Sequence, residues 1–130
     1  MNHRSREDVM WWVRLEEELP SPGTNDVEAV AAAINSRASA HARRLCREPE
    51  VVRVRLGDRV AIADADLSHV FTRLSRNGPL ASAALVVERV ATRWVCPGCA
   101  RAQSLWTSCK CAMPVRLLTG TEMVLDSMQG

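Results

Sequence analysis

Four of the chain's five cysteines fall between positions 96 and 111, a density that hydrophobic packing does not require. Cys96 and Cys99 form a CxxC pair, and Cys109 and Cys111 form a CxC pair after nine intervening residues. Thiolates are soft ligands, and four of them in a closed tetrahedral set suit Zn²⁺, an ion without redox chemistry. The spacing therefore predicts a structural zinc site made by these four side chains.

The two cysteine pairs differ in how easily they reach one ion. Pro97 and Gly98 favour a tight turn that curls the first pair around a metal. In an extended strand Cys109 and Cys111 point the same way, so the chain must curve there for both to bind. Disulfides would need an oxidising compartment, which nothing in the sequence indicates. A redox CxxC pair normally lies beside a βαβ pattern, and we expect none here.

His3 suggests a second metal site. A free Met1 amine, the backbone nitrogens of Asn2 and His3 and the His3 imidazole would form a square-planar nitrogen set, which suits Ni²⁺ or Cu²⁺. The alternative is a solvated histidine without a ligand role. The site requires that Met1 is retained and that nothing precedes it.

Composition narrows the class of protein. A chain of 130 residues predicts one domain, or one domain with a small inserted module. The net charge of +2, from 17 basic and 15 acidic residues, is too balanced to indicate binding to nucleic acid or to an anionic membrane. No run approaches the roughly 18 apolar residues of a membrane span, and no signal peptide is evident. We expect a cytoplasmic protein, whose reducing surroundings keep thiolates available for metal.

Hydrophobic periodicity predicts the elements that position the cysteines. We expect helices over residues 26–46 and 64–76, and strands over 52–56, 84–90 and 122–128. Asn25 and Glu28 form a capping box for the first helix, and Asp64 caps the second. The apolar faces comprise Val27, Val30, Ile34, Ala38, His41 and Leu45 on the first helix, and Leu67, Val70, Phe71 and Leu74 on the second. The cysteines lie in residues 91–119, a segment too short to fold on apolar burial alone, so a metal would stabilise it.

Several other polar residues are expected to be structural. His41 on the apolar helix face predicts a partly buried histidine with a hydrogen-bond partner, and Cys46 predicts a small buried side chain rather than a fifth ligand. Asp64, Asp66 and His69 could form an acid–base group, but acidic residues are common at a helix start. The sequence therefore does not predict an enzyme.

Residues 1–23 form an extension before these elements. Val9, Met10, Trp12 and Val13 fall near helical spacing, and the prolines and glycine after residue 19 end the pattern. One interpretation is a loosely packed tail. The other is a docking strip, because Trp11 and Trp12 are favoured at interfaces.

The order helix, strand, helix, strand, cysteine segment, strand resembles the HypA/HybF family of nickel-incorporation proteins for hydrogenase maturation. The Val-Arg-x-x-x-Gly-acidic passage of residues 52–58 and the closing Gly-x-Glu-hydrophobic strand that begins at Gly120 carry the resemblance, which covers about residues 24–128. It implies an α/β (α+β) fold with two helices on a three-stranded sheet and an inserted zinc-ribbon-like module between the second and third strands. The implied division is an extension (1–23), an α/β domain (24–90 and 120–130) and a zinc-binding module (91–119).

The resemblance implies a metallochaperone, not an enzyme, that delivers Ni²⁺ during [NiFe]-hydrogenase maturation and keeps Zn²⁺ as a structural ion. The implied partners are an accessory GTPase and the hydrogenase large-subunit precursor. The alternative is a zinc-ribbon module that contacts protein or nucleic acid and has lost nickel transfer. Its basic rim would comprise Arg89, Arg93, Arg101, Lys110 and Arg116.

This chain departs from the family pattern at its nickel ligands. The family starts with Met-His-Glu directly ahead of the first helix, whereas the matching positions here are Thr24, Asn25 and Asp26. The second cysteine pair is also CxC instead of the family's CxxC. Nickel binding has therefore either moved to Met1, Asn2 and His3 or been lost while docking is kept. A third outcome is that zinc binding is kept and the site now senses or mediates protein contacts, and the sequence leaves all three open.

Overall fold

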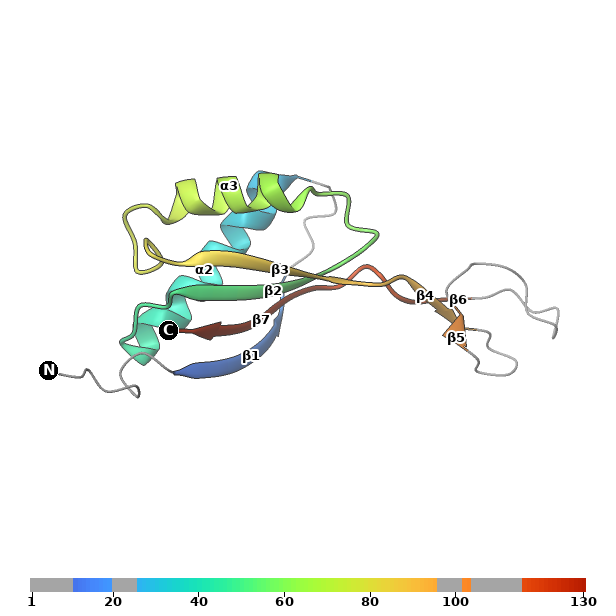
Figure 1. The fold of residues 1–130 in the computed structure, drawn as a ribbon, viewed down its shortest axis with the longest axis horizontal. Helices are drawn as coiled ribbons and strands as arrows, with labels where there is room; N and C mark the ends of the chain where they lie inside the picture. The colour runs from blue at the N-terminus through green and yellow to red at the C-terminus, as the bar shows by residue number, and fades with distance from the viewer. Residues whose placement is uncertain (1–10, 20–25, 96–101, 104–115) are drawn as a thin grey trace, which may run out of the picture.

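The computed structural model describes residues 11–19, 26–95, 102–103 and 116–130. The described part holds two helices, α2 (Val27–Leu45) and α3 (Asp64–Ser75). Its strands are β1 (Trp12–Glu18), β2 (Val51–Gly57), β3 (Ala84–Val90), β4 (Arg93–Val95), β5 (Ala102–Gln103), β6 (Arg116–Thr119) and β7 (Met123–Gln129). They form a four-stranded sheet in the order β1-β7-β2-β3 and a three-stranded sheet in the order β5-β4-β6. Figure 1 shows the second sheet projecting from one end of the first.

Helix α2 begins one residue later than its predicted capping box. The Asp26 carboxylate accepts hydrogen bonds from the backbone N–H groups of Glu28 (3.0 Å) and Ala29 (3.4 Å). Asp26 is therefore the N-cap, and the prediction of Asn25 for this role was wrong. The helix ends at Cys46, whose φ of 54° is left-handed and whose side chain is exposed, so the predicted burial of Cys46 was also wrong.

Helix α3 covers the core with most of its predicted stripe. Leu67 and Phe71 are fully buried, whereas Leu74 is 41% exposed and does not belong to the stripe. The neighbouring Ser75 is buried instead of Leu74. Its hydroxyl is satisfied there, because it donates to the Phe71 carbonyl (2.7 Å) and accepts from the Asn35 amide (2.7 Å). Asp64 is the first residue of the helix, and its side chain makes no capping bond, contrary to prediction.

Strands β2 and β3 pair in parallel through the α3 crossover, in register from Val51 with Ala84 to Gly57 with Val90. Val52, Val54 and Leu56 are fully buried, as the alternating pattern predicted. The chain thus contains a βαβ unit, which the sequence interpretation had excluded. The cysteine segment follows this unit instead of lying at its strand-to-helix turn.

Strand β1 gives the main sheet four strands, not the expected three, and shows that a helical tail was the wrong expectation. Trp11, Val13 and Leu15 pack against the core with the period of a strand, and Trp12 is 53% exposed on the opposite face. The pairing of β1 with β7 shifts between Arg14 and Glu17, where Glu16 adopts a φ of 46°. Burial alternates along the whole strand, so the charged run Glu16–Glu18, and not a change of alternation, hides the strand in the sequence.

The core lies between the helices and one face of the four-stranded sheet. Figure 1 shows α2 crossing behind the sheet and α3 running along β3. The largest fully buried side chains include Phe71, Ile34, Leu56, Leu67, Leu80, Leu125 and Met128. Leu125 and Met128 both face this core although they are three residues apart, because β7 has a register shift at Asp126.

Candidate metal centre

Every predicted metal ligand lies outside the described residues. This applies to Cys96, Cys99, Cys109 and Cys111, and also to Met1, Asn2 and His3. The described part of the chain contains no group of three or more His, Cys, Asp or Glu side chains that could hold a metal ion. The structure does describe the strands that border both sets of predicted ligands. These are β4, β5 and β6 around the cysteine pairs and β1 after the N-terminal residues.

The second sheet brackets the cysteines. Val95, the residue before Cys96, pairs with Ala102 on one side and with Arg116 on the other. Neighbouring strands lie about 4.8 Å apart, so these three backbone positions are close together. The cysteine-bearing segments 96–101 and 104–115 are therefore bounded by residues of one small sheet.

The two sheets are joined by a stem of two chain crossings, residues 91–92 and 120–122. Thr119 donates from its hydroxyl to the Ala91 carbonyl across the stem (2.7 Å). Gly57 approaches this stem so closely that a Cβ atom there would overlap the carbonyl of Gly120. Gly120 itself has a φ of 126°, which only glycine adopts without strain. The backbone at this junction therefore requires both glycines.

Arg89 supports the loop between β2 and α3. Its Nη1 donates to the carbonyl oxygens of Gly57 and Val60, each at 3.0 Å, and its Nη2 donates to that of Ile62. Its Nε donates to the Asp64 carboxylate at 2.9 Å. Arg89 is therefore a structural residue, not part of a basic rim around the cysteines as predicted. Sequence offers little sign of this role, because backbone carbonyls far along the chain create it.

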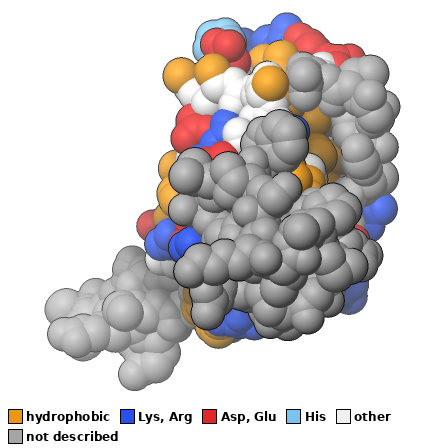
Figure 2. All heavy atoms as spheres, turned by 90° about the vertical axis from the view of Figure 1, so that its right-hand side faces the viewer, with side chains coloured by type: hydrophobic (Ala, Val, Ile, Leu, Met, Phe, Trp, Pro, Cys, Tyr) orange, Lys and Arg blue, Asp and Glu red, His pale blue; other side chains and the backbone are white. Residues whose placement is uncertain are grey.

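Of the other members of the predicted rim, the structure describes the side chain of Arg93 alone. Arg93 is exposed on β4, while Arg101 and Lys110 lie outside the described residues and the Arg116 side chain is not described. Figure 2, which views the molecule from the end with the second sheet, shows acidic and basic side chains intermixed on the described surface. The described part of this surface therefore offers no single-sign field for nucleic acid.

A cluster of polar side chains fastens β1 to α2. Glu17 accepts hydrogen bonds from His41 Nε2 (2.6 Å) and from Arg37. These bonds, first that from His41 and then that from Arg37, hold the pKa of Glu17 below its usual range. Because the Arg44 guanidinium only donates, His41 Nδ1 accepts from it and Nε2 carries the proton. His41 is thus a partly buried, hydrogen-bonded residue, as predicted.

Asp64, Asp66 and His69 are not gathered into a site. The carboxylate of Asp64 pairs with Arg89 at 2.8 Å, and the Asp66 and His69 side chains are exposed on α3.

Within the described ranges, no helix is long and apolar enough to cross a membrane.

Strand β1 carries the N-terminal segment away from the second sheet. Trp11 exchanges two backbone hydrogen bonds with Gly130 (3.1 and 3.0 Å), at the end of the main sheet opposite the stem. Leu19, at the other end of β1, bonds to the Met123 carbonyl (2.7 Å) beside the stem. Seven residues of strand separate these ends by about 20 Å. Strand β1 therefore begins at the end of the main sheet opposite the stem.

A family model described as "Hydrogenase/urease nickel incorporation, metallochaperone, hypA" matches residues 26–130. The fold is similar to a solution structure of the Ni metallochaperone HypA from Helicobacter pylori, with a TM-score of 0.56 and 18% identity over 78% of this chain and 95% of that one. A second solution structure of a HypA protein gives a TM-score of 0.60 and 19% identity, covering 83% of this chain and 98% of that one. No curated protein matches. The family match begins at the N-cap of α2, so β1 lies wholly ahead of it.

Proposed function

The chain belongs to the HypA family of nickel metallochaperones, as its resemblance predicted, and we propose from this premise that it delivers Ni²⁺ during [NiFe]-hydrogenase maturation. The family serves hydrogenase and urease nickel incorporation and is not a family of enzymes. One observation carries the assignment: the match runs from the first residue of the helical core through the cysteine segment to β7. The partners we propose are an accessory GTPase and the hydrogenase large-subunit precursor, met in the cytoplasm.

We further propose that Cys96, Cys99, Cys109 and Cys111 hold one structural Zn²⁺. The donor set supports this, because four thiolates fit that ion. The pairing of Val95 also supports it, because its partners are Ala102, between the two cysteine pairs, and Arg116, after the second pair. A bound ion would contribute folding free energy to a sheet of very short strands. On this proposal the chain divides into an extension (1–23), an α/β domain (24–90 and 120–130) and a zinc-binding module (91–119).

Nickel is the cargo, and its ligands are the least conventional part of this chain. Asp26 stands where the family's Met-His-Glu start has its glutamate. Its carboxylate accepts hydrogen bonds from the N–H groups of Glu28 and Ala29 and caps α2. We propose that Met1, Asn2 and His3 bind Ni²⁺ instead, with the amine, backbone nitrogens and imidazole as ligands. Such a site would release its ion more easily than a closed cage, which suits delivery.

Metal analysis and Ni²⁺ titration calorimetry on untagged protein with its native N-terminus test this function. We expect one zinc per chain and one Ni²⁺ bound at micromolar or tighter affinity. His3→Ala should abolish the nickel binding and leave the zinc in place. The matched control is His69→Ala, which removes an exposed histidine from α3 and should change neither metal.

Two other results would change the assignment. Nickel binding that survives His3→Ala would place the cargo site elsewhere in the chain. Zinc without any nickel binding would favour the alternative function, a zinc-ribbon interaction module that has lost nickel transfer. In that case, retention on heparin or DNA that falls steeply with salt would distinguish a nucleic-acid partner from a protein partner.

A further inference from the structure

The loop after β2 bonds to the chain beside both crossings of the stem. The Asp58 N–H donates at 2.9 Å to the carbonyl of Val90, the last residue of β3 before the first crossing. The Arg59 N–H donates at 2.8 Å to the carbonyl of Gly120, which begins the second crossing. One bond therefore lies ahead of the cysteine segment and the other after it.

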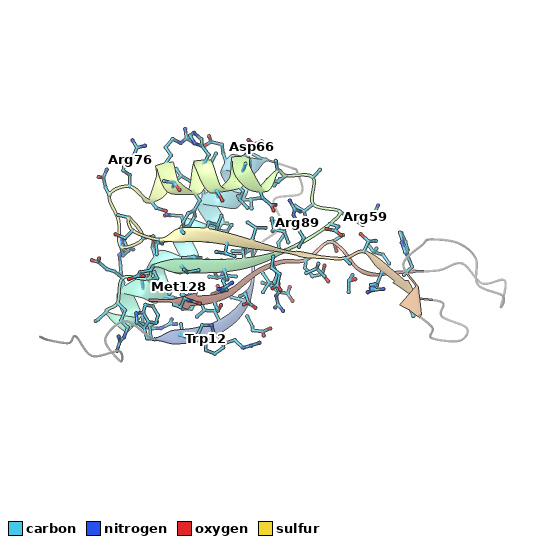
Figure 3. All side chains as sticks on the ribbon, in the orientation of Figure 1. Trp12, Arg59, Asp66, Arg76, Arg89 and Met128 are labelled. Atoms are coloured by element: carbon cyan, nitrogen blue, oxygen red, sulfur yellow. The ribbon has the colours of Figure 1, made fainter. Side chains whose placement is uncertain are left out.

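The side chain of Arg59 contacts the second sheet. Its guanidinium carbon lies 5.5 Å from the ring centroid of Trp94, a half-buried residue of β4. This distance fits a cation–π contact, which attracts a cation to the face of an indole. Figure 3 shows Arg59 beside the start of the stem, next to Arg89. A charged side chain of one sheet's loop thus contacts an aromatic ring of the other sheet.

The Arg59 backbone is held in place by its neighbours. Arg89 donates to carbonyl oxygens on both sides of it, those of Gly57 and Val60, and is itself fixed by Asp64 at the start of α3. A continuous chain of contacts therefore runs from α3 through Arg89 and the loop to Trp94. The loop presents the Arg59 side chain from a fixed base.

We propose that Arg59 is a positioning residue, whose contact with Trp94 sets the orientation of the second sheet relative to the four-stranded sheet. The two sheets are joined through two chain crossings, residues 91–92 and 120–122. A side-chain contact made away from these crossings opposes rotation of one sheet relative to the other. The proposal concerns orientation alone and holds whichever metal the chain carries.

Hydrogen exchange at the stem measures this role. The amide of Arg59 reports opening at the stem, since it donates to Gly120 in the second crossing, and the amide of Asp58 reports the adjoining end of β3 through Val90. Arg59→Met keeps an unbranched apolar stem close to that of arginine and removes the charged guanidinium, so both amides should exchange about two- to fivefold faster. Arg59→Lys retains a cation and should restore most of the protection. The amide of Leu67, which donates to the Ala63 carbonyl in α3, should not change.

A matched control separates the contact from a general charge effect. Arg93→Met removes an exposed arginine from β4 and should leave both stem amides unchanged. Residual dipolar couplings give an independent readout. The amides of β4 and β6 should share one alignment with those of β2 in the wild type and in Arg59→Lys, and lose it in Arg59→Met.

Changes on the ring side complete the test. Trp94→Phe keeps a weaker aromatic face and should give an intermediate exchange rate, whereas Trp94→Leu should match Arg59→Met. The proposal is overturned if Arg59→Met leaves exchange and alignment unchanged, or if Arg93→Met has the same effect. Equal behaviour of Arg59→Lys and Arg59→Met would also overturn it, because the charge would then have no part.

Discussion

The two sheets of this protein are stabilised by different means. The four-stranded sheet shares a core with α2 and α3, and it contributes fully buried side chains such as Val54, Leu56 and Leu125. The second sheet has strands of three, two and four residues. Among its described side chains none belongs to the buried hydrophobic set. The first sheet can fold by burial of apolar surface, and the second requires something else.

The difference bears on the proposed zinc. A structural metal contributes most where a hydrophobic core is absent, and the described side chains of the second sheet include none that is fully buried. The α/β part, by contrast, has no need of a metal to fold. Loss of metal should therefore affect the two regions unequally.

The largest expected effect is the loss of the proposed zinc. Cys96→Ser removes one of four thiolates, and structural zinc sites contribute about 10–16 kcal/mol of apparent binding free energy. We expect zinc to be lost and the amides of Trp94 and Leu117 to lose their protection from hydrogen exchange. The amide of Leu67 should stay protected, because α3 belongs to the hydrophobic core.

The fifth cysteine provides the control for this experiment. Cys46 is exposed at the end of α2, so Cys46→Ser should keep the zinc and the protection of both regions. If Cys96→Ser unfolded the α/β part as well, the two regions would form one cooperative unit. The contrast between them would then be wrong.

A smaller effect is expected at the junction of the two regions. In Gly57→Ala the new methyl group would overlap the Gly120 carbonyl, which is backbone and has no side-chain freedom to move away. Overpacking of this kind costs about 1–3 kcal/mol, which chemical denaturation would measure. Gly78→Ala is the matched control, because a Cβ there meets nothing within 4 Å. Equal stability of the two variants would contradict the close approach.

Sequence periodicity was sufficient for the elements whose side chains face one core. The helix over 64–76 and the strand over 84–90 agree closely with α3 and β3. Both have regular spacing and clear ends, so local signals and burial favour the same structure. The residues that departed from prediction, such as Leu74 and Cys46, lie in the last turn or at the cap of a helix, where the periodic face no longer decides burial.

The sequence failed where distant contacts decide the structure. β1 was missed although its burial alternates throughout, because the inward position after Leu15 is the charged Glu17, whose carboxylate bonds to His41 of α2. Arg89 was assigned to a basic rim, since no local signal shows that loop carbonyls surround it. The predicted metal ligands stay predictions, because they lie outside the described residues.

The smallest expected effect concerns how β1 is fastened to α2. Glu17 has a lowered pKa because His41 and Arg37 donate to its ionised carboxylate. A carboxyl group whose pKa falls on folding stabilises the folded state at every pH above its unfolded pKa, which is near 4.5. This stabilisation is lost as the pH falls through the lower pKa of the folded state. Glu17→Gln should therefore cost about 0.5 kcal/mol at neutral pH, because partly exposed ion pairs contribute little.

Denaturation of Glu17→Gln and of the wild type from pH 7 to pH 3 checks this effect. The stability difference should be constant at neutral pH and shrink below about pH 4.5, as the wild-type carboxyl group becomes protonated. Glu18→Gln is the matched control, since Glu18 is the exposed neighbour on the same strand. It should change the stability little at neutral pH. If the two variants behaved alike, β1 would be held by its apolar side chains and backbone bonds alone, in the same way as the rest of the main sheet.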